Sequence, residues 1–450
     1  MRGVVTRFAP SPTGDLHLGG LRTALFNKLF AMKHGGRMLL RVEDTDRSRL
    51  VQGSVERMIE VLQWAGLGVG AEQAQYQSER LPLYEQASAQ LLQEGKAYRC
   101  FCSSERLATL KKKGSSSLYD RMCLHLGEEE GRARARGGES HVVRLLVPER
   151  EEGRTVVTDL IRGKVVFGHS QVDDQVLLKS DGFPTYHLAS VVDDHAMHVT
   201  HVIRGEEWLP STVKHVMLYE ALGLPMPQFA HLPLLLSSEP GGGKLSKRHA
   251  AASAKGFVER GYMPGAVVNF VATLGFTPSR EIMSLEELAQ DFSLERVSKG
   301  GARVDLQKLA WINTHYVKAA LQVPEERAQL ARLFKSYLPE HVTEEYAARI
   351  LDTIHDRLSV LSEIAERCSY FWETPPMDPS VDLEAVTHAV QALSRLEGEW
   401  TEQSVGEALK GAKFPHLRKA LTNSRVGAPV LATIVCLGKD VVMERLERFI

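Results

Sequence analysis

The segment VVTRFAPSPTGDLHLGG, residues 4–20, decides the fold of this chain. Its first five residues form a short apolar run typical of a buried strand, and the prolines and glycine of residues 9–14 interrupt regular structure. Leucines and phenylalanines then recur at helical spacing from His17 to His34, where Gly35 and Gly36 end the pattern. This order predicts a ligand site at the loop, because the carboxyl end of the strand and the free N–H groups of the helix meet there.

The pattern continues outward from this segment. A second apolar run at 38–42 and a helical pattern at 55–62 predict parallel strands with helices packed on their faces. Residues 80–183 differ, with a helical pattern at 83–94 and strand-like runs at 142–147, 155–159 and 164–167. Strand-like runs at 191–192 and 199–204 resume the first pattern, and helical periodicity dominates beyond about residue 310.

These patterns predict a Rossmann-type α/β catalytic domain with a parallel sheet, an inserted α+β domain, and an all-α C-terminal region. We place the catalytic domain at 1–79 and 184–237, the insertion at 80–183, a domain carrying the loop 244–248 at 238–321, and the helical region at 322–450.

The composition excludes several classes of protein. The chain has 450 residues, 43% hydrophobic and 25% charged, which is ordinary for a globular protein. Its net charge is −1, so a nucleic-acid partner requires positive charge gathered on one face. Five cysteines do not suffice for a disulfide scaffold, no run of 18 residues is wholly apolar, and the N-terminus lacks a signal-peptide pattern. We expect a protein of a reducing compartment without a membrane span.

Two segments carry groups suited to phosphate chemistry. His17 stands at the predicted helix start beside Gly19 and Gly20, which let a nucleotide approach the backbone. Residues 244–248, KLSKR, follow three glycines and offer cations to a pyrophosphate leaving group. Each segment alone has an ordinary explanation, a capping histidine or a solvated basic loop. Their occurrence together favours nucleotide chemistry.

Together the two segments resemble the HIGH and KMSKS motifs of class I aminoacyl-tRNA synthetases. Within that class the chain resembles glutamyl-tRNA synthetases in the stretches RFAPSPTG (7–14), RVEDTD (41–46), KSDGFPTYHLA (179–189), VVDDH (191–195) and RGEEW (204–208). The resemblance is strong to about residue 315 and looser beyond. It implies a ligase that activates L-glutamate with ATP and transfers it through glutamyl-adenylate to the 3′ end of tRNA(Glu).

The resemblance also implies roles for individual residues. The catalytic groups are His17, Lys244 and Lys247, and ATP with Mg²⁺ contacts Gly19, Glu207, Leu235, Ser246 and Lys247. Glutamate contacts Arg7, Ala9, Ser11, Glu43, Tyr186, Ser190 and Arg204. Two positions depart from the family pattern: Ser190 stands where asparagine is frequent, and Gly20 replaces the last histidine of the class I motif.

The physics of glutamate binding agrees with this set. Two carboxylates and one ammonium group require at least two cations and one acid, which Arg7, Arg204 and Glu43 supply. Glutamine would leave an arginine unpaired, and such a mismatch gives about 10⁴-fold discrimination, so no editing site is needed. Asp193, Asp194 and His195 also offer metal ligands, but adjacent side chains of a strand point to opposite faces, which favours a structural or pocket-floor role.

A second constellation lies in the insertion. Cys100, Cys102, Cys123 and His125 make a sufficient tetrahedral zinc set of soft ligands. The spacing resembles the zinc element of some family members, of which some use a tyrosine, so Tyr119 competes with His125 as the fourth ligand. The alternative is a set of buried free cysteines.

The resemblance implies tRNA(Glu) as the acceptor and leaves open whether tRNA(Gln) is a second one. We expect a monomeric enzyme of the bacterial cytoplasm, with the mitochondrial matrix as the alternative location. We expect a basic RNA-binding face across the insertion and the helical tail, including residues 111–113 and 132–136. Three other readings are a tRNA-modifying relative, a glutaminyl enzyme and a silent RNA-binding paralogue. The long helical tail opposes the first two, and the retained His17 and loop lysines oppose the third.

Overall fold

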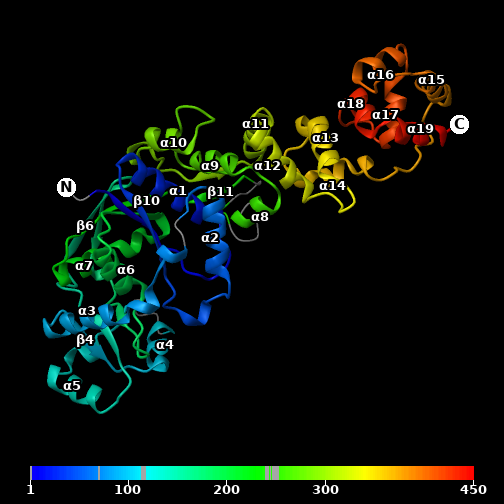
Figure 1. The fold of residues 1–450 in the computed structure, drawn as a ribbon. Helices are drawn as coiled ribbons and strands as arrows, with labels where there is room; N and C mark the ends of the chain where they lie inside the picture. Colours follow the sequence, from blue (N-terminus) through cyan, green and yellow to red (C-terminus); the bar gives the residue numbers. More distant parts are fainter. Residues whose placement is uncertain (1–2, 69–70, 113–117, 239–242, 244, 246–252) are drawn as a thin grey trace. The chain divides into compact units, whose positions relative to one another are not determined.

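The computed structural model describes residues 3–68, 71–112, 118–238, 243, 245 and 253–450 (Figure 1). The chain forms two compact units, one of residues 1–255 with 268–305 and one of 256–267 with 306–450. The predicted loop residues Lys244, Ser246 and Lys247 lie outside the described residues. Among the described residues, no helix combines the length and the apolar character needed to cross a lipid bilayer.

The first unit begins with the predicted strand, loop and helix. Strand β1 (Val5–Phe8) is wholly buried and is followed by helix α1 (Leu18–Lys33). Strand β2 (Arg37–Val42) pairs with β1 in parallel, and the short strand β3 (Gln75–Tyr76) pairs with β2 beyond helix α2 (Ser54–Trp64). The predicted strands and helices of this half are therefore present.

A second sheet has the order β7-β6-β10-β9. Strands β9 (His201–Gly205), β10 (Gln228–Leu232) and β6 (Arg154–Asp159) run in parallel, while β7 (Gly163–Gly168) pairs with β6 as a hairpin. The two sheets meet where Thr200 N–H donates to the carbonyl oxygen of Val5 at 2.9 Å, next to β9. The β6–β7 hairpin lies within the range predicted for the insertion, yet it extends the sheet that contains β9 and β10.

The remaining part of that range forms its own antiparallel sheet, β4-β5-β8. Its strands are β4 (Ala97–Cys100), β5 (Val142–Leu145) and β8 (Val176–Leu178). Around them lie helices α3 (Leu81–Gln93), α4 (Ser104–Lys112) and α5 (Glu128–Arg136), drawn in blue to cyan in Figure 1.

One sequence prediction is wrong. Residues 191–195 lie in helix α6 (Tyr186–Ala196), not in a strand. A short apolar run does not by itself distinguish a buried strand from a buried helix, and this helix is buried along Leu188–Asp194. Helix α7 (Leu209–Leu222) follows β9, and the first unit is completed by β11 (Leu235–Ser237), β12 (Ala302–Val304), paired in parallel, and α10 (Leu285–Asp291).

The second unit is helical over its described residues. The helices from residue 306 onward are α11 (Leu306–Leu321), α12 (Pro324–Lys335), α13 (Glu344–Ile354), α14 (Ile364–Arg367), α15 (Leu383–Ser394), α16 (Glu402–Ala408), α17 (Phe414–Thr422), α18 (Val430–Leu437) and α19 (Lys439–Glu447). Helices α8 (Ala254–Glu259) and α9 (Pro264–Ala272) span the junctions between the units. The all-α character predicted for this region is confirmed.

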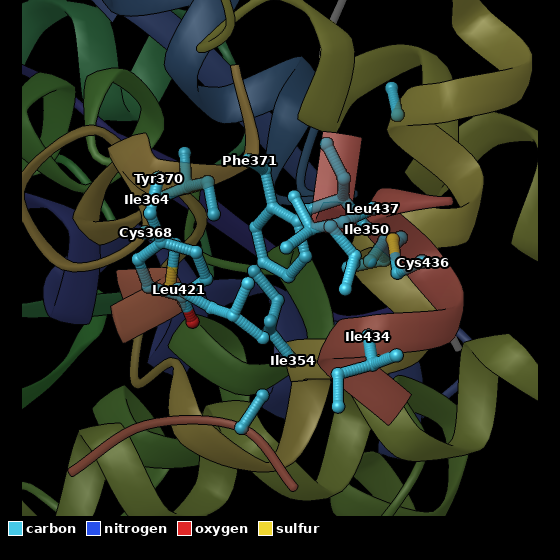
Figure 2. Packing of buried hydrophobic residues seen from close by; sticks show 14 of the residues in the cluster. Ile350, Ile354, Ile364, Cys368, Tyr370, Phe371, Leu421, Ile434, Cys436 and Leu437 are labelled. Carbon is cyan, nitrogen blue, oxygen red and sulfur yellow. The ribbon is translucent and has the colours of Figure 1, made fainter. Parts of the chain in front are cut away.

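Helix α13 shows why this unit folds. Thr343 caps its first turn by accepting from Tyr346 N–H, and Ala347, Ile350, Leu351 and Ile354 line its buried face at spacings of three and four residues. These side chains pack against residues of α17 and α18, including Leu421, Ile434 and Leu437 (Figure 2). Burial of each such aliphatic side chain contributes roughly 1.5–3 kcal/mol.

Candidate active site

A cavity of about 620 Å³ opens at the carboxyl ends of β1 and β9 in the first unit. Its walls come from the loop after β1, the N-terminus of α1, the ends of β2 and β9, and the start of α6. The structure brings into this one cavity the predicted residues Arg7, Ala9, Ser11, His17, Gly19, Glu43, Tyr186, Arg204, Glu207 and Leu235. Leu245, a described residue of the segment 244–248, also lines it.

Ser190 is the predicted contact that lies apart. It is fully buried on α6 and is not among the described residues that line the cavity. Its Oγ lies 3.4 Å from Arg41 Nη2, so its contact is with the floor of the cavity.

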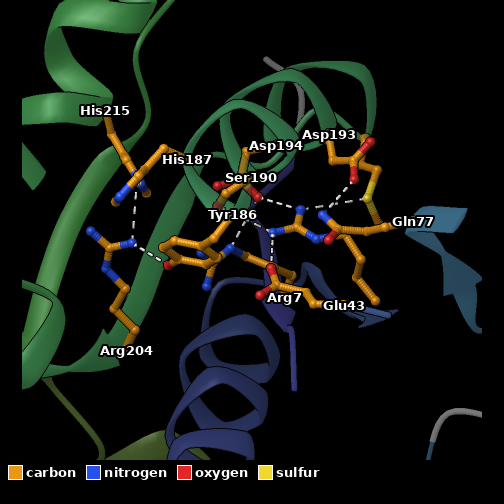
Figure 3. Close-up of polar contacts among 12 residues, drawn as sticks. Arg7, Glu43, Gln77, Tyr186, His187, Ser190, Asp193, Asp194, Arg204 and His215 are labelled. Carbon is orange, nitrogen blue, oxygen red and sulfur yellow. Dashed lines mark hydrogen bonds and ion pairs between the residues drawn. The ribbon is translucent and has the colours of Figure 1, made fainter. Parts of the chain in front are cut away.

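Asp194 is the centre of that floor (Figure 3). Its Oδ1 accepts from Arg7 Nε at 3.1 Å and from Arg41 Nη1 at 2.6 Å, and Arg41 Nη2 donates to Glu43 Oε1 at 3.1 Å. All four side chains are less than one-tenth exposed. The network therefore fixes the orientations of Arg7 and Glu43. These are its two charged side chains that line the cavity.

The charges within this network set the protonation states. Burial raises the pKa of Glu43, against the opposing effect of Arg41 and Arg7. Burial also acts on Asp194, but the positive charges of Arg41 and Arg7 outweigh it and hold the pKa of Asp194 below its ordinary value. Asp194 therefore stays ionised, while Glu43 is the carboxylate that gains most from a further cation.

Arg204 has a different environment. All five of its N–H groups are directed at neutral acceptors: His231 Nε2 at 3.1 Å, Tyr186 Oη at 2.8 Å, His215 Nδ1 at 3.4 Å, Thr212 Oγ1 at 2.9 Å and the carbonyl oxygen of Trp208 at 3.4 Å. Among the described residues it forms no ion pair with a carboxylate. Its buried positive charge therefore faces the cavity uncompensated by a direct partner.

The histidines around Arg204 are kept neutral. Burial, followed by Lys214 and Arg204, lowers the pKa of His187 to about 3, and burial lowers the pKa of His215 well below its ordinary value. His187 Nδ1 and His215 Nε2 lie 3.1 Å apart, so a neutral pair shares one proton donor between them. A neutral His215 keeps Nδ1 free of a proton to accept from Arg204.

The N-terminus of α1 forms the other half of the cavity. His17 Nδ1 accepts from Gly20 N–H at 2.9 Å, so a neutral ring carries its proton on Nε2. A Cβ at Gly19 would lie 3.1 Å from His17 Nδ1, and one at Gly20 would lie 2.7 Å from Leu16 Cδ1. A side chain at either glycine would therefore make His17 or Leu16 shift in this compact capped turn.

Glu206 and Arg22 hold the strand that borders this half. Glu206 Oε1 accepts from Leu234 N–H at 2.8 Å and forms an ion pair with Arg162. Arg22 Nη2 donates to the carbonyl oxygen of Pro233 at 2.6 Å. These contacts fix the position of Leu235, while Glu207 itself lines the cavity.

The zinc prediction depends on four residues around β4. The sulfurs of Cys100, Cys102 and Cys123 lie within 4.8 Å of one another, and Tyr119 Oη lies 3.4 Å from Cys100 Sγ and 3.2 Å from Cys102 Sγ. His125, at the end of a short 3-10 helix (Met122–His125), is not part of this group. Three thiols and one phenol at one point are compatible with a structural zinc ion. The structure places Tyr119, rather than His125, with the cysteines.

Sequence reasoning missed several residues of the site. Arg41 stands inside a quoted motif but was given no role, and Trp208, His215 and His231 were not singled out; the structural or pocket-floor role predicted for Asp194 agrees with its position. The signal for Arg41 is a charged residue inside an otherwise apolar buried strand.

The geometry defines a cavity with a nucleotide half and a charged amino-acid half. The family model described as "tRNA synthetases class I (E and Q), catalytic domain" matches residues 3–311, and an "Anticodon binding domain" model matches residues 329–450. The chain belongs to this class I tRNA synthetase family, as the sequence motifs predict.

The relatives carry one particular name. A protein of Alkaliphilus metalliredigens named "Glutamate--tRNA ligase" is 42% identical over 99% of both chains, and one of Finegoldia magna with the same name is 38% identical over 100% of this chain and 99% of its own. The solved structure of a glutamate tRNA ligase from Elizabethkingia meningosepticum, in complex with its amino acid, aligns with a TM-score of 0.86 and 34% identity over 100% of this chain and 99% of that chain. The predicted fold and enzyme class are confirmed.

Proposed function

We propose that this chain is a glutamate--tRNA ligase that activates L-glutamate with ATP and transfers it to the 3′ end of tRNA(Glu). The observation that carries this proposal is the buried network of Arg7, Asp194, Arg41 and Glu43 beside Arg204, in the same cavity as the capped helix start at His17. In the amino-acid half of the cavity, Arg7, Arg204 and Glu43 match the two carboxylates and the ammonium group of glutamate.

In the amino-acid half, Glu43 receives the ammonium group of glutamate. Arg7 is held through Nε by Asp194, which leaves its terminal nitrogens for a carboxylate, and Arg204 supplies the second positive charge. Ala9, Ser11 and Tyr186 complete the walls, and Ser190 acts through Arg41. Glutamine lacks the second negative charge, so it leaves a buried arginine uncompensated.

In the nucleotide half, the α-carboxylate of glutamate attacks the α-phosphate of ATP and pyrophosphate leaves. No enzyme nucleophile is required, because positioning and stabilisation of phosphate charge suffice. His17 donates from Nε2, and Gly19, Glu207 and Leu235 hold the nucleotide. Lys244, Ser246 and Lys247 neutralise the leaving pyrophosphate, and Mg²⁺ arrives with ATP. The tRNA ribose hydroxyl then attacks the activated carbonyl and displaces AMP.

We also propose a structural Zn²⁺ held by Cys100, Cys102, Cys123 and Tyr119. The convergence of the three sulfurs and the phenolic oxygen supports this set. When bound, zinc would cross-link β4 to the segment around Cys123 and so hold the inserted sheet in shape.

The four-part division remains the framework for RNA binding. We propose that 80–183 contacts the acceptor end, 238–321 the stem and 322–450 the anticodon, although the β6–β7 hairpin serves the catalytic sheet. The acceptors are tRNA(Glu) and, as the finer proposal, tRNA(Gln). The enzyme acts as a monomer in a bacterial cytoplasm, since the relatives named above are bacterial proteins. The mitochondrial matrix stays the alternative location.

Pyrophosphate exchange tests the activity. The full chain is assayed with glutamate or glutamine, each with and without tRNA(Glu) and tRNA(Gln). We expect exchange with glutamate, and we expect rejection of glutamine by about 10⁴-fold. Absence of glutamate-dependent exchange with every tRNA would refute the proposed activity, and equal use of glutamine would refute the charge argument.

A further inference from the structure

Two buried residues lie behind Arg204, outside the set that lines the cavity. Asp159 ends β6 and His231 lies in β10, and both are less than one-tenth exposed. Asp159 Oδ2 lies 2.6 Å from His231 Nδ1, and His231 Nε2 lies 3.1 Å from Arg204 Nε. The three side chains form a line from the hairpin to the cavity.

The donor and acceptor at each hydrogen bond of this line follow from the chemistry of the side chains. Arg204 has only donors, so His231 Nε2 must accept and the ring proton must be on Nδ1, facing the Asp159 carboxylate. The other oxygen of Asp159, Oδ1, accepts from the N–H groups of Ile161 at 2.9 Å and Arg162 at 2.7 Å. The turn after β6 therefore orients Asp159, which sets the tautomer of His231.

We propose that Asp159 and His231 are positioning residues for glutamate recognition: they hold Arg204 in the orientation that presents its charge to the side-chain or α-carboxylate of the amino acid. The inference rests on the proposed function, because it concerns how that site selects its substrate. Neither residue touches substrate. Their effect passes through one tautomer and one hydrogen bond to Arg204.

The geometry explains why a histidine serves here rather than an acid. A carboxylate directly on Arg204 would neutralise the charge that glutamate needs, whereas neutral His231 accepts a hydrogen bond and keeps the negative charge of Asp159 one ring away. Arg204 is thereby held rigidly while it remains available as a counter-charge.

Asp159→Asn is the first test. The backbone donors at Ile161 and Arg162 retain the amide oxygen, so the amide NH₂ faces His231 Nδ1 and forces the ring proton onto Nε2, against Arg204. We expect the Kd and KM for glutamate to rise about tenfold, with the KM for ATP unchanged and a lower preference for glutamate over glutamine. Thr158→Val, on the exposed side of the same strand, is the matched control.

His231→Gln and His231→Leu are the second test. Glutamine can donate to Asp159 and accept from Arg204, so it should stay within about threefold of wild type, whereas leucine should weaken glutamate binding at least about tenfold. A merely structural role would not separate the two variants in this way. This pair decides the inference if Asp159→Asn does not fold.

Wild-type protein is measured first, by calorimetric binding of L-glutamate and by pyrophosphate exchange. Absence of both would refute the proposed function and this inference with it. With an active wild type, an unchanged KM for glutamate in Asp159→Asn overturns the positioning role alone. So does equal loss in His231→Gln and His231→Leu, or a parallel rise in the KM values for glutamate and ATP.

Discussion

At the scale of single residues, the three arginines of the site differ in how many carboxylate partners they have. Arg41 forms ion pairs with Asp194 and Glu43, Arg7 is held by Asp194 through Nε, and Arg204 is held by neutral groups. Charge compensation by carboxylates therefore decreases from Arg41 in the floor, through Arg7, to Arg204 at the cavity wall. A negatively charged ligand is therefore drawn to Arg7 and Arg204 rather than to Arg41.

Glu43→Gln tests the ammonium site. The amide keeps the shape of Glu43 but removes the charge that we propose receives the ammonium group, so we expect the KM for glutamate to rise about 10- to 100-fold. Steady-state exchange kinetics measure the effect. Glu56→Gln, on the exposed face of α2, should behave as wild type. A Glu43→Gln enzyme with wild-type KM would contradict the assigned role.

The neutral histidines predict a loss of stability in mild acid. His187 and His215 titrate near pH 6.5 when unfolded, but the folded pKa of His187 is about 3 and that of His215 is lowered by burial. The unfolded chain therefore binds more protons below about pH 6.5, and the free energy of unfolding falls by up to about 1.4 kcal/mol per pH unit for each group. Urea unfolding at several pH values measures the slope.

His187→Gln should make that slope shallower, and replacement of the exposed His388 by glutamine should not. An identical pH dependence in wild type and His187→Gln would show that His187 is not the group held neutral by folding.

The sequence predicted the residues that line the cavity better than the residues that hold them in place. Arg7, Glu43, His17 and Arg204 could be assigned because each sits in a motif that resembles those of glutamyl-tRNA synthetases, and all four line the cavity. The partners of Asp194, and any role for His215 and His231, could not be predicted, because they depend on contacts across 11 to 187 positions of sequence. Periodicity carries no information about such pairs.

At the scale of elements, the strands of the range 80–183 belong to two different sheets. Strands β4, β5 and β8 form their own sheet, while β6 and β7 extend the sheet of β9 and β10. Both groups of strands have strand-like sequence patterns, so the sequence predicted that they are strands but not which strands they pair with. Two arginines of α5 already have acidic partners, because Arg132 pairs with Glu128 and Arg134 with Glu139.

The proposed zinc site predicts that Tyr119 and His125 contribute differently to zinc binding. Zinc analysis of protein purified without chelator should give about one equivalent. Tyr119→Phe should weaken zinc retention about 10- to 100-fold in competition with a chromophoric chelator, because it removes one of four donors, whereas His125→Ala should retain wild-type affinity. Loss of zinc in His125→Ala but not in Tyr119→Phe would reverse the assignment, and absence of zinc in wild type would refute the site.

At the scale of the whole molecule, near-neutral charge conceals the expected RNA-binding surface. The formal net charge is −1, so binding of a polyanion must rely on local groups of lysine and arginine. Such binding releases counterions. The KM for tRNA should therefore rise at least about tenfold between 50 and 200 mM salt, while the KM for glutamate, whose site is buried, changes little. Equal salt dependence of both constants would contradict a separate electrostatic RNA surface.

The parallel pairing of β1 with β2, and the contact of Arg7 with Asp194 across 187 positions of sequence, have a consequence for biosynthesis. Arg204 meets His231 in β10 after 27 further residues, whereas Arg7, in the first strand to leave the ribosome, meets Asp194 only after 187. At about 5–20 residues per second, this interval lasts roughly 10–40 s, during which Arg7 and Arg41 lack their buried counter-charge. Stalled nascent chains should therefore gain protease resistance over residues 5–42 only after Asp194 of α6 has emerged, and earlier protection would show that β1 and β2 fold without it.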